Sequence, residues 1–461
     1  MKSNNLNIII LAAGEGTRMK SATPKVLHPI IDKPMIRWVT DAAEKLHPQK
    51  IYLIVSPKTK QAIAELYKND NKYVLVTQPK PLGTAHAVKQ SSRYLANSTS
   101  DVLIFCGDTP LLTSDTLLSL WKKHGSVRNA LTLSSAVVHK PYGYGRVKME
   151  VTTNHVVAIV EENDASPEEK KINEINVGVY CASARTLFKA LNKVRPNNIK
   201  GEYYLTDAVK IMSDEHQRVG VYRITDEREC WGVNTRCQLA DAARVLRQRI
   251  LEYHMANGVT IIDPATTYID SQTVIGQDTT ILPGTFLKGA TVIGTNCTVG
   301  PFTMIENSII KNNTTLIMSV IEDSKIGNNV ISGPWSHLRP GCVIKDNVKI
   351  GNYAEVKKSV LSSNVHMGHH SYIGDSIVGE DVNIGAGVIT CNYDGITKHS
   401  TVIQPNAFIG SNSNLVAPVV IGNNAVIAAG STITENVPAK SLAIARQRQT
   451  VKLNWNIRRR K

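Results

Sequence analysis

An aliphatic residue recurs every six positions through the second half of the chain, between about residues 275 and 437, and a small residue follows it four positions later. The first run has aliphatic places at Ile275, Ile281, Leu287, Ile293, Val299 and Ile305, and small places at Thr279, Thr285, Thr291, Cys297 and Thr303. Aliphatic runs return at Ile326, Leu338, Ile344, Ile350 and Val356, and at Ile409, Leu415, Ile421, Ile427 and Ile433. Such hexads predict a parallel β-helix with three hexads per coil and both places pointing inward. A β-sandwich with chance spacing is the alternative, and the repeated in-phase runs disfavour it.

Short apolar runs separated by helix-length stretches characterise the first half, at residues 6–11, 51–55, 73–76 and 102–105. This alternation predicts an α/β domain with a mostly parallel sheet. In that class of fold, ligands bind outside the carboxyl ends of the strands.

Glycines follow the first of these runs directly. Gly14 and Gly16 allow successive backbone N–H groups to turn toward an anion, and Arg18 and Lys25 place positive charge just beyond them. The loop is neither the dinucleotide fingerprint, since Met19 stands at the third glycine place, nor a P-loop. We interpret it as a phosphate cradle, with a plain turn as the alternative.

Two more loops follow predicted strands of the first half. Asp108 ends the Cys106-Gly107-Asp108 segment and is the best metal-ligand candidate, because Mg²⁺ needs only one or two protein groups when substrate phosphates supply the rest. Capping of the turn before Pro110 is the alternative role for Asp108. Gln78 and the loop around Gly83 lie where a base would be recognised.

A helical pattern joins the two halves. Asn234 and Thr235 can cap a helix whose apolar places recur at three- and four-residue spacing until Gly258. We therefore expect a domain at 1–236, a linker helix at 237–257 and the β-helix at 258–461, which ends in the basic run 458–461. That run is expected to be a basic tail.

Composition narrows the class of protein. A chain of 461 residues with 42% hydrophobic residues fits two or three globular domains, and no apolar run approaches a membrane span. The start of the chain lacks the features of a signal peptide, and seven scattered cysteines without a C-x-x-C pattern indicate free thiols and a cytoplasmic location. A net charge of +15 suits polyanionic ligands, whereas an aromatic content of 5% without a clustered aromatic-basic motif argues against a nucleic-acid binder.

The repeat breaks indicate where the β-helix carries chemistry, because a solenoid uses its edges and loops for function. Residues 390–401 form a polar insertion that we expect to project from a coil. In the hexad from Met367, the inward places are Met367 and Ser371, so His369 and Tyr372 point outward. His369 could act as a general base, although an exposed histidine is more often without function. Cys342 and Cys391 could carry an acyl group, but no histidine adjoins them, and we interpret them as structural.

Motifs along nearly the whole chain resemble one family. They include residues 11–19, 24–27, 82–87, 106–108, 143–146, 160–161, 174–176, 201–207 and 232–234, and in the β-helix 333–340, 357–358, 368–369, 383–387 and 390–395. These segments resemble the bacterial bifunctional GlmU family, which joins an N-acetylglucosamine-1-phosphate uridylyltransferase to a glucosamine-1-phosphate acetyltransferase. The resemblance implies a Rossmann-like nucleotidyltransferase domain, a linker helix and a left-handed parallel β-helix. It also implies a product that feeds cell-wall and lipopolysaccharide synthesis.

The resemblance also implies site residues for uridylyl transfer. UTP and the product would be held by Leu11, Ala12, Ala13, Gly14, Lys25, Gln78, Gly83, Thr84, Cys106, Gly107 and Asp108 together with Gly145, Glu161, Asn176 and Asn234. Within this set Gly145, Glu161 and Asn176 would hold the sugar, and Asp108 and Asn234 would bind Mg²⁺. Arg18, with Lys25, would act on the phosphates as a catalytic residue.

For acetyl transfer, the resemblance makes His369 the base that takes a proton from the amine of glucosamine-1-phosphate. Sugar-phosphate contacts would come from Arg339, Lys357, Tyr372 and Asn383, and acetyl-CoA contacts from Ala386, Asn392, Tyr393, Ser411, Ala429 and Arg446. Similar solenoids form homotrimers with acetyl-CoA sites between subunits, so we expect a homotrimer that binds neither nucleic acid nor membrane.

Three departures from the family pattern bear on fine contacts: Cys106 in place of tyrosine, Pro81 in place of glutamine, and Trp231 after Cys230 in place of an acidic residue. Two alternatives share the domain pair. One is a sugar nucleotidyltransferase with a regulatory solenoid, resembling ADP-glucose pyrophosphorylase, and the other is a scaffold subunit of a translation-factor exchange complex. His369 with the Asn392-Tyr393 segment disfavours the first, and the set of Arg18, Lys25, Asp108 and Asn234 disfavours the second.

Overall fold

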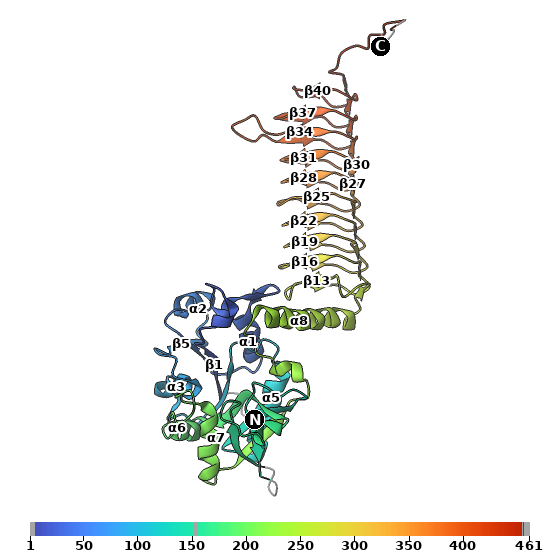
Figure 1. The fold of residues 1–461 in the computed structure, drawn as a ribbon. Helices are drawn as coiled ribbons and strands as arrows, with labels where there is room; N and C mark the ends of the chain where they lie inside the picture. Colours follow the sequence, from blue (N-terminus) through green and yellow to red (C-terminus); the bar gives the residue numbers. More distant parts are fainter. Residues whose placement is uncertain (1–4, 151–154, 454, 456–461) are drawn as a thin grey trace, which may run out of the picture. The chain divides into compact units, whose positions relative to one another are not determined.

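The computed structural model describes residues 5–150, 155–453 and 455, and the chain divides into two compact units, Met1–Leu246 and Arg247–Lys461. Figure 1 shows the ribbon of both units, and each unit has its own hydrophobic core. The basic run expected at 458–461 and the first four residues lie outside the described residues.

The N-terminal unit is built on a nine-stranded sheet in the order β11-β7-β10-β6-β1-β4-β5, with β8 and β9 attached beside β10. Its strands are β1 (Leu6–Ala12), β4 (Ile51–Val55), β5 (Tyr73–Thr77), β6 (Asp101–Cys106), β7 (Leu131–Val137), β8 (Arg146–Met149), β9 (Val156–Val160), β10 (Glu174–Ser183) and β11 (Val219–Arg223). The pairs β6-β1, β1-β4 and β4-β5 are parallel, as the alternating pattern predicts. Strand β10 runs antiparallel to β6 and β7. A two-stranded ribbon, β2 (Pro29–Ile30) and β3 (Lys33–Pro34), is separate.

Helices cover both faces of this sheet. They are α1 (Met35–Glu44), α2 (Lys60–Leu66), α3 (Thr84–Lys89), α4 (Ser92–Leu95), α5 (Ser114–Val127), α6 (Ala184–Leu191) and α7 (Leu205–Asp214), with 3₁₀ turns η1 (Thr17–Met19), η2 (Lys25–Leu27), η3 (Glu169–Lys171) and η4 (Glu227–Cys230). Along β1, Ile8 and Ile10 belong to the core that includes α1 and α5, whereas Ile9 belongs to the core that includes α3, α6 and α7. The alternation follows from the two-residue period of a strand, so a fully buried parallel strand reads as an uninterrupted apolar run.

Helix α8 (Arg236–Ala256) occupies the predicted linker region. Thr235 caps it, because its Oγ1 accepts from the backbone N of Gln238 at 3.2 Å while Gln238 Oε1 accepts from the backbone N of Thr235 at 3.1 Å. This is a reciprocal capping box. It fixes the start of the helix directly after Thr235.

Three parallel sheets stack their short strands into the β-helix, and Figure 1 shows the second sheet as the stack from β13 to β40. The first sheet contains β12 (Thr260–Ile261), β15 (Thr280–Ile281), β18 (Thr298–Val299), β21 (Thr315–Leu316), β24 (Ile331–Ser332), β27 (Lys349–Asn352), β30 (His366–His369), β33 (Asn383–Ile384), β36 (Phe408–Ile409), β39 (Val426–Ile427) and β41 (Leu442–Ala443). The second contains β13 (Tyr268–Ile269), β16 (Phe286–Lys288), β19 (Met304–Glu306), β22 (Val320–Glu322), β25 (His337–Leu338), β28 (Glu355–Lys357), β31 (Tyr372–Gly374), β34 (Ile389–Cys391), β37 (Asn414–Val416) and β40 (Thr432–Ile433). The third contains β14 (Val274–Ile275), β17 (Val292–Ile293), β20 (Ile309–Ile310), β23 (Lys325–Ile326), β26 (Val343–Ile344), β29 (Val360–Leu361), β32 (Ser376–Val378), β35 (Thr401–Ile403) and β38 (Val419–Ile421).

The predicted inward places form the core of the solenoid. Every predicted aliphatic place is buried, and so are the five small places of the first run. A small place also satisfies the backbone: Thr279 Oγ1, for example, donates to the carbonyl oxygen of Gly294 at 2.8 Å. The hexad pattern is therefore confirmed, and the second half of the chain is a parallel β-helix.

The expected insertion leaves the coil after β34. Residues 392–400 separate β34 from β35, and Tyr393 and Lys398 pair across the loop as an antiparallel bridge. Figure 1 shows this loop projecting from the stack beside β34 and β37.

Candidate active sites

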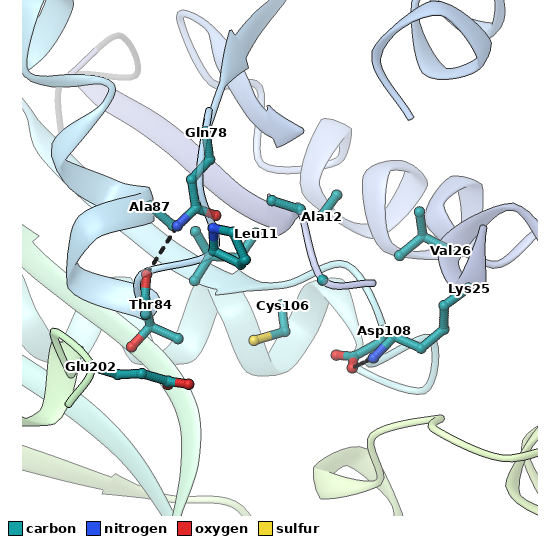
Figure 2. A pocket seen from close by; sticks show the side chains of 14 residues that line it. Leu11, Ala12, Lys25, Val26, Gln78, Thr84, Ala87, Cys106, Asp108 and Glu202 are labelled. Carbon is teal, nitrogen blue, oxygen red and sulfur yellow. Dashed lines mark hydrogen bonds and ion pairs between the residues drawn. The ribbon is translucent and has the colours of Figure 1, made fainter. Parts of the chain in front are cut away.

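The N-terminal unit has a pocket of about 260 Å³ at the carboxyl ends of β1 and β6, which we call the nucleotide pocket (Figure 2). Its lining residues are Leu11, Ala12, Ala13, Gly14, Lys25, Val26, Gln78, Pro81, Gly83, Thr84, Ala87, Cys106, Asp108 and Glu202. The glycine loop, the loop after β5 and the end of β6 therefore meet at one place, as the rule for parallel sheets predicts.

A network holds the loop around Gly83 against the wall of the pocket. Gln78 is buried and donates from Nε2 to the carbonyl oxygen of Gly83 at 3.2 Å, and the Thr84 hydroxyl accepts from the backbone N of Leu205 at 2.9 Å. Gly83 has φ 108°, and a Cβ there would lie 2.5 Å from the carbonyl oxygen of Tyr203. Only glycine satisfies both demands. The backbone contact with Tyr203 also brings Glu202 to the pocket, where Figure 2 shows its carboxylate pointing toward the interior.

At the other end of the pocket, the Lys25 ammonium contacts side-chain oxygens of both Asp108 and Asn234. The Lys25 ammonium pairs with Asp108 and donates to Asn234 Oδ1 at 3.0 Å. The backbone N of Val233 donates to the carbonyl oxygen of Asp108 at 2.8 Å, which brings the loop before α8 to the end of β6. Two oxygens 126 positions apart in the sequence thus converge on one positive charge.

A second group of side chains, which we call the sugar cluster, consists of Gly145, Glu161 and Asn176. The backbone N of Asn176 donates to the carbonyl oxygen of Gly145 at 2.8 Å, and a Cβ on Gly145 would lie 3.4 Å from Glu161 Oε2. These three predicted residues lie outside the lining of the nucleotide pocket but close to one another. Tyr180 interacts electrostatically with both Glu161 and Cys106, so it links the cluster with the pocket.

Burial controls the ionisation of both groups. Burial raises the pKa of Glu161 above its usual value, an effect that a hydrogen bond from the Thr206 hydroxyl at 3.1 Å reduces. Burial also raises the pKa of the Cys106 thiol to about 12, with the neighbouring Asp108 carboxylate adding to the shift. Cys106 is therefore a neutral lining residue at physiological pH and not a nucleophile.

Arg18 lies on η1, exposed, outside the lining of the nucleotide pocket. Gly107 is buried directly behind the pocket, where a Cβ would lie 3.3 Å from the carbonyl oxygen of Leu11. Arg18 follows the glycine loop in the sequence, and no contact with the described residues fixes its side chain.

In the β-helix, one corner between the first and second sheets carries a column that we call the histidine corner. It contains His369, Ala386, Ser411 and Ala429, one from each successive coil, with Arg446 against Gly430 at its end. Backbone hydrogen bonds join the column, since the N of Asn412 donates to the carbonyl oxygen of Ala386 at 2.7 Å and the N of Gly430 to that of Ser411 at 2.8 Å. His369 Nδ1 lies 2.8 Å from Asn352 Oδ1 on the preceding coil. This hydrogen bond orients the imidazole and leaves Nε2 for a substrate.

The opposite corner, between the second and third sheets, gathers positive charge, and we call it the cationic corner. It contains Arg339 and Lys357, with Tyr372 and Asn392 beside them. The Lys398 ammonium lies next to Lys357 and, with partial burial, lowers the pKa of Lys357. Asn392 pairs with Asp375, which fixes the base of the 392–400 loop.

Most of the predicted acetyltransferase residues therefore lie on two edges of the second sheet in one protomer. Tyr393 is exposed on the loop, and Asn383 points outward from the first sheet between His366 and Phe408. Sequence reasoning missed Lys398, Asp375, Asn352 and Glu202. Asn352 was open to prediction, because it precedes His369 by 17 positions, which is about one coil. Lys398 was hidden by the loop that breaks the repeat.

Two general features complete the description. All seven cysteines are free, as the sequence predicts, and none of the described helices has the length and apolar character of a membrane span. Among the described residues there is no group of three or more His, Cys, Asp or Glu side chains arranged to hold a metal ion. A Mg²⁺ site made of one carboxylate, one amide and substrate phosphates would not form such a group.

Comparisons with known proteins agree with the two-domain architecture. The nucleotidyl transferase family matches residues 7–232, and the bacterial transferase hexapeptide family matches residues 272–307, 323–358 and 400–435. A solved UDP-glucose pyrophosphorylase in complex with UDP-glucose covers 53% of this chain and 98% of its own at 17% identity, with a TM-score of 0.42, a likeness too distant to bear on function.

Curated relatives match the chain almost from end to end. The chain is 47% identical to the bifunctional protein GlmU of Geobacillus sp. (strain WCH70) over 97% of its own length and 96% of that relative. It is 44% identical to the protein of the same name from Acetivibrio thermocellus over 98% of both chains, and 45% identical to that of Listeria monocytogenes over 97% of both. A match of this extent covers both units.

Proposed function

The chain belongs to the bifunctional GlmU family, and from that premise we propose how its two units divide the synthesis of UDP-N-acetylglucosamine. The enzyme is a glucosamine-1-phosphate N-acetyltransferase and a UDP-N-acetylglucosamine diphosphorylase. Acetyl-CoA and UTP are its co-substrates. The single observation that carries this conclusion is the end-to-end identity with GlmU proteins, which neither a nucleotidyltransferase with a regulatory solenoid nor a translation-factor scaffold would give.

In the N-terminal unit, the nucleotide pocket receives UTP. Backbone groups from Leu11 to Gly14, together with Gln78, Gly83 and Thr84, hold the uridine, while Lys25 and Arg18 neutralise the phosphates. An oxygen of the sugar phosphate attacks the α-phosphorus, a new phosphorus–oxygen bond forms, and the bond to the β-phosphate breaks to release pyrophosphate. Positioning and charge neutralisation suffice for this step, so no protein nucleophile is needed.

Asp108 and Asn234 would hold Mg²⁺. Their oxygens fit a cation because both already face the Lys25 ammonium. A bound Mg²⁺ ion supplies positive charge to the phosphates of the nucleotide. Lys25 is then free to contact a phosphate.

The sugar cluster receives N-acetylglucosamine-1-phosphate. Glu161 and Asn176 offer an oxygen and an amide to sugar hydroxyls, and Gly145 leaves the space between them open. The raised pKa of Glu161 and the contact of Tyr180 with the cluster support a closed, partly dehydrated subsite.

In the β-helix, His369 Nε2 takes a proton from the amine of glucosamine-1-phosphate as that nitrogen attacks the thioester carbon of acetyl-CoA. The carbon–nitrogen bond forms, the carbon–sulfur bond breaks, and CoA leaves as the thiol. Arg339 and Lys357, with Tyr372 and Asn383, bind the amino-sugar phosphate. Ala386, Asn392, Tyr393, Ser411, Ala429 and Arg446 contact acetyl-CoA.

The active form is a homotrimer. The outward places of the third sheet form an aliphatic stripe over eight of its nine strands, at Val274, Val292, Ile309, Val343, Val360, Ile377, Val402 and Val420, and Lys325 occupies the remaining place. An extended apolar face of this kind, with one charged residue in it, indicates a protein interface. Because the histidine and cationic corners lie on different edges of one protomer, the acetyltransferase site is complete only where two copies meet.

The enzyme acts in the cytoplasm. Seven free cysteines in one chain support a reducing compartment.

Two substitutions test whether each unit catalyses one of the two reactions. Asp108→Ala should abolish pyrophosphate release from UTP and leave CoA release intact, whereas His369→Ala should abolish CoA release and leave pyrophosphate release from N-acetylglucosamine-1-phosphate intact. Each variant is the control for the other. Loss of both activities in either variant would contradict separate sites.

A further inference from the structure

The side chain of Arg146, at the start of β8, is 2% exposed. A buried guanidinium is stable only when its charge and its N–H donors have partners. Arg146 Nη2 donates to Glu162 Oε2 at 2.8 Å, and Nη1 donates to the carbonyl oxygen of Tyr144, whereas Nε has no hydrogen-bond partner among the described residues. Neither Arg146 nor Glu162 has a role in the proposed reaction.

The carboxylate of Glu162 makes one more hydrogen bond to the turn at residues 143–146. Glu162 Oε2 also accepts from the backbone N of Gly143 at 3.1 Å. Burial acts to raise the pKa of Glu162, but the hydrogen bonds from Arg146 and Gly143 outweigh it and keep the pKa below its usual value. The carboxylate is therefore charged at neutral pH, and one ion pair anchors residues 143–146 at both ends.

This turn and its anchor border the sugar cluster. Gly145 stands between Tyr144 and Arg146, and Glu161 directly precedes Glu162. A Cβ on Gly145 would lie 2.9 Å from Ile159 Cγ2, so the turn lies close against β9. Strands β8 and β9 are paired with Arg146 opposite Val160. Any movement of the turn would move Gly145 relative to Glu161.

We propose that Arg146 and Glu162 are positioning residues for the sugar-phosphate substrate of uridylyl transfer. By anchoring the 143–145 turn, they hold Gly145 and Glu161 at the spacing that N-acetylglucosamine-1-phosphate requires. The inference rests on the proposed role of the sugar cluster. Neither side chain contacts the reacting atoms.

Steady-state kinetics of the full-length protein test this role. In Arg146→Met and Glu162→Ala, the KM for N-acetylglucosamine-1-phosphate should rise by about tenfold or more, because small displacements of a positioning group cost one to two orders of magnitude. The KM for UTP should stay within about twofold, since the nucleotide pocket keeps its contacts. Glu162→Gln keeps an oxygen for Gly143 and Arg146 and should recover most of the loss.

A double variant separates positioning from folding. Arg146→Met alone leaves a carboxylate without its partner, whereas Arg146→Met with Glu162→Leu replaces the pair by apolar groups and should restore the melting temperature. The turn still lacks its anchors, so the KM for the sugar phosphate should remain raised. Arg223→Met is the matched control, because Arg223 forms a bidentate pair with Glu174 at 2.9 Å but is 57% exposed.

Two results would overturn the inference: an unchanged sugar-phosphate KM in the folded double variant, or an equal rise of the KM for UTP. A wild-type enzyme that releases no pyrophosphate would instead contradict the proposed function. CoA release by the same preparations reports that the β-helix is intact.

Discussion

Lys25 donates a hydrogen bond to Asn234 Oδ1 over 3.0 Å, although the two residues are 209 positions apart in the chain. The same ammonium pairs with Asp108. Lys25 is therefore the partner of both oxygens that would bind Mg²⁺. Without it, two acceptor oxygens would lie close together with no donor between them. If these oxygens bind Mg²⁺, the ammonium has to leave them, and we expect it then to contact the phosphates of the nucleotide.

Replacing Lys25 with Met should lower uridylyl transfer by about 10²- to 10³-fold, the range found when one charge-stabilising donor is removed from an active site. Without nucleotide, the variant should bind Mn²⁺ more tightly than the wild type, because no ammonium competes for Asp108 and Asn234. Electron paramagnetic resonance of free Mn²⁺ measures this binding. Equal Mn²⁺ affinity in the two proteins would show that Lys25 does not compete with the metal ion.

Replacing Asn352 with Ala should lower acetyl transfer by about tenfold, since His369 Nδ1 loses the partner that orients its ring. The pH profile of CoA release should change in the variant, and pyrophosphate release should not. Asn296→Ala is a matched control, because Asn296 makes a similar hydrogen bond to Asn313 at 2.8 Å elsewhere on the solenoid. An acetyl-transfer rate equal to that of the wild type in both variants would contradict the proposed role of Asn352.

Replacing Glu161 with Gln should make the N-terminal unit more stable at pH 7. Burial raises the pKa of Glu161 above 4.5 in the folded protein, so its contribution to the free energy of unfolding is favourable below about pH 4.5 and is lost as the pH rises through the folded-state pKa. Glutamine keeps an acceptor for Thr206 and carries no charge. The melting temperature of the variant should therefore fall less between pH 4 and pH 7, while its KM for N-acetylglucosamine-1-phosphate should be raised. A wild-type melting curve that depends on pH just as the variant's does would contradict the assignment.

Replacing Ile309 and Ile377 together with Glu should dissociate the trimer and abolish acetyl transfer. These residues are 46% and 54% exposed on the aliphatic stripe of the third sheet, and charges at an apolar interface would be buried without partners. Light scattering should give three times 50.5 kDa for the wild type and less for the variant. Ile331→Glu, at a 45% exposed outward place of the first sheet, should leave the mass unchanged. A monomeric wild-type protein with full acetyltransferase activity would refute the shared site.

The sequence predicted the solenoid and the nucleotide pocket because both follow from local rules. An inward aliphatic every six positions identifies each coil, and polar residues just after buried strands identify the binding edge. Glu161 and Asn176 have no such periodic signal, since their meeting depends on the pairing of β8 with β9 and β10. The antiparallel course of β10 was likewise not encoded by the apolar pattern. Arg146 gave no sign of burial, because its partner Glu162 lies 16 positions away across a turn.

Lys398 shows a second limit. It joins Lys357 at the cationic corner although the 392–400 loop interrupts the repeat, so counting in coils from Lys357 does not reach it. A contact made by an inserted loop depends on how that loop folds back, and hexad spacing carries no information on this.

The most direct test of two coupled sites mixes purified protein with glucosamine-1-phosphate, acetyl-CoA, UTP and Mg²⁺, and follows free CoA and pyrophosphate separately. We expect CoA release without UTP, and pyrophosphate release only after acetylation or when N-acetylglucosamine-1-phosphate is supplied. Pyrophosphate release from glucosamine-1-phosphate without release of CoA would indicate that the β-helix is only a scaffold. Release of neither CoA nor pyrophosphate would contradict the enzymatic account.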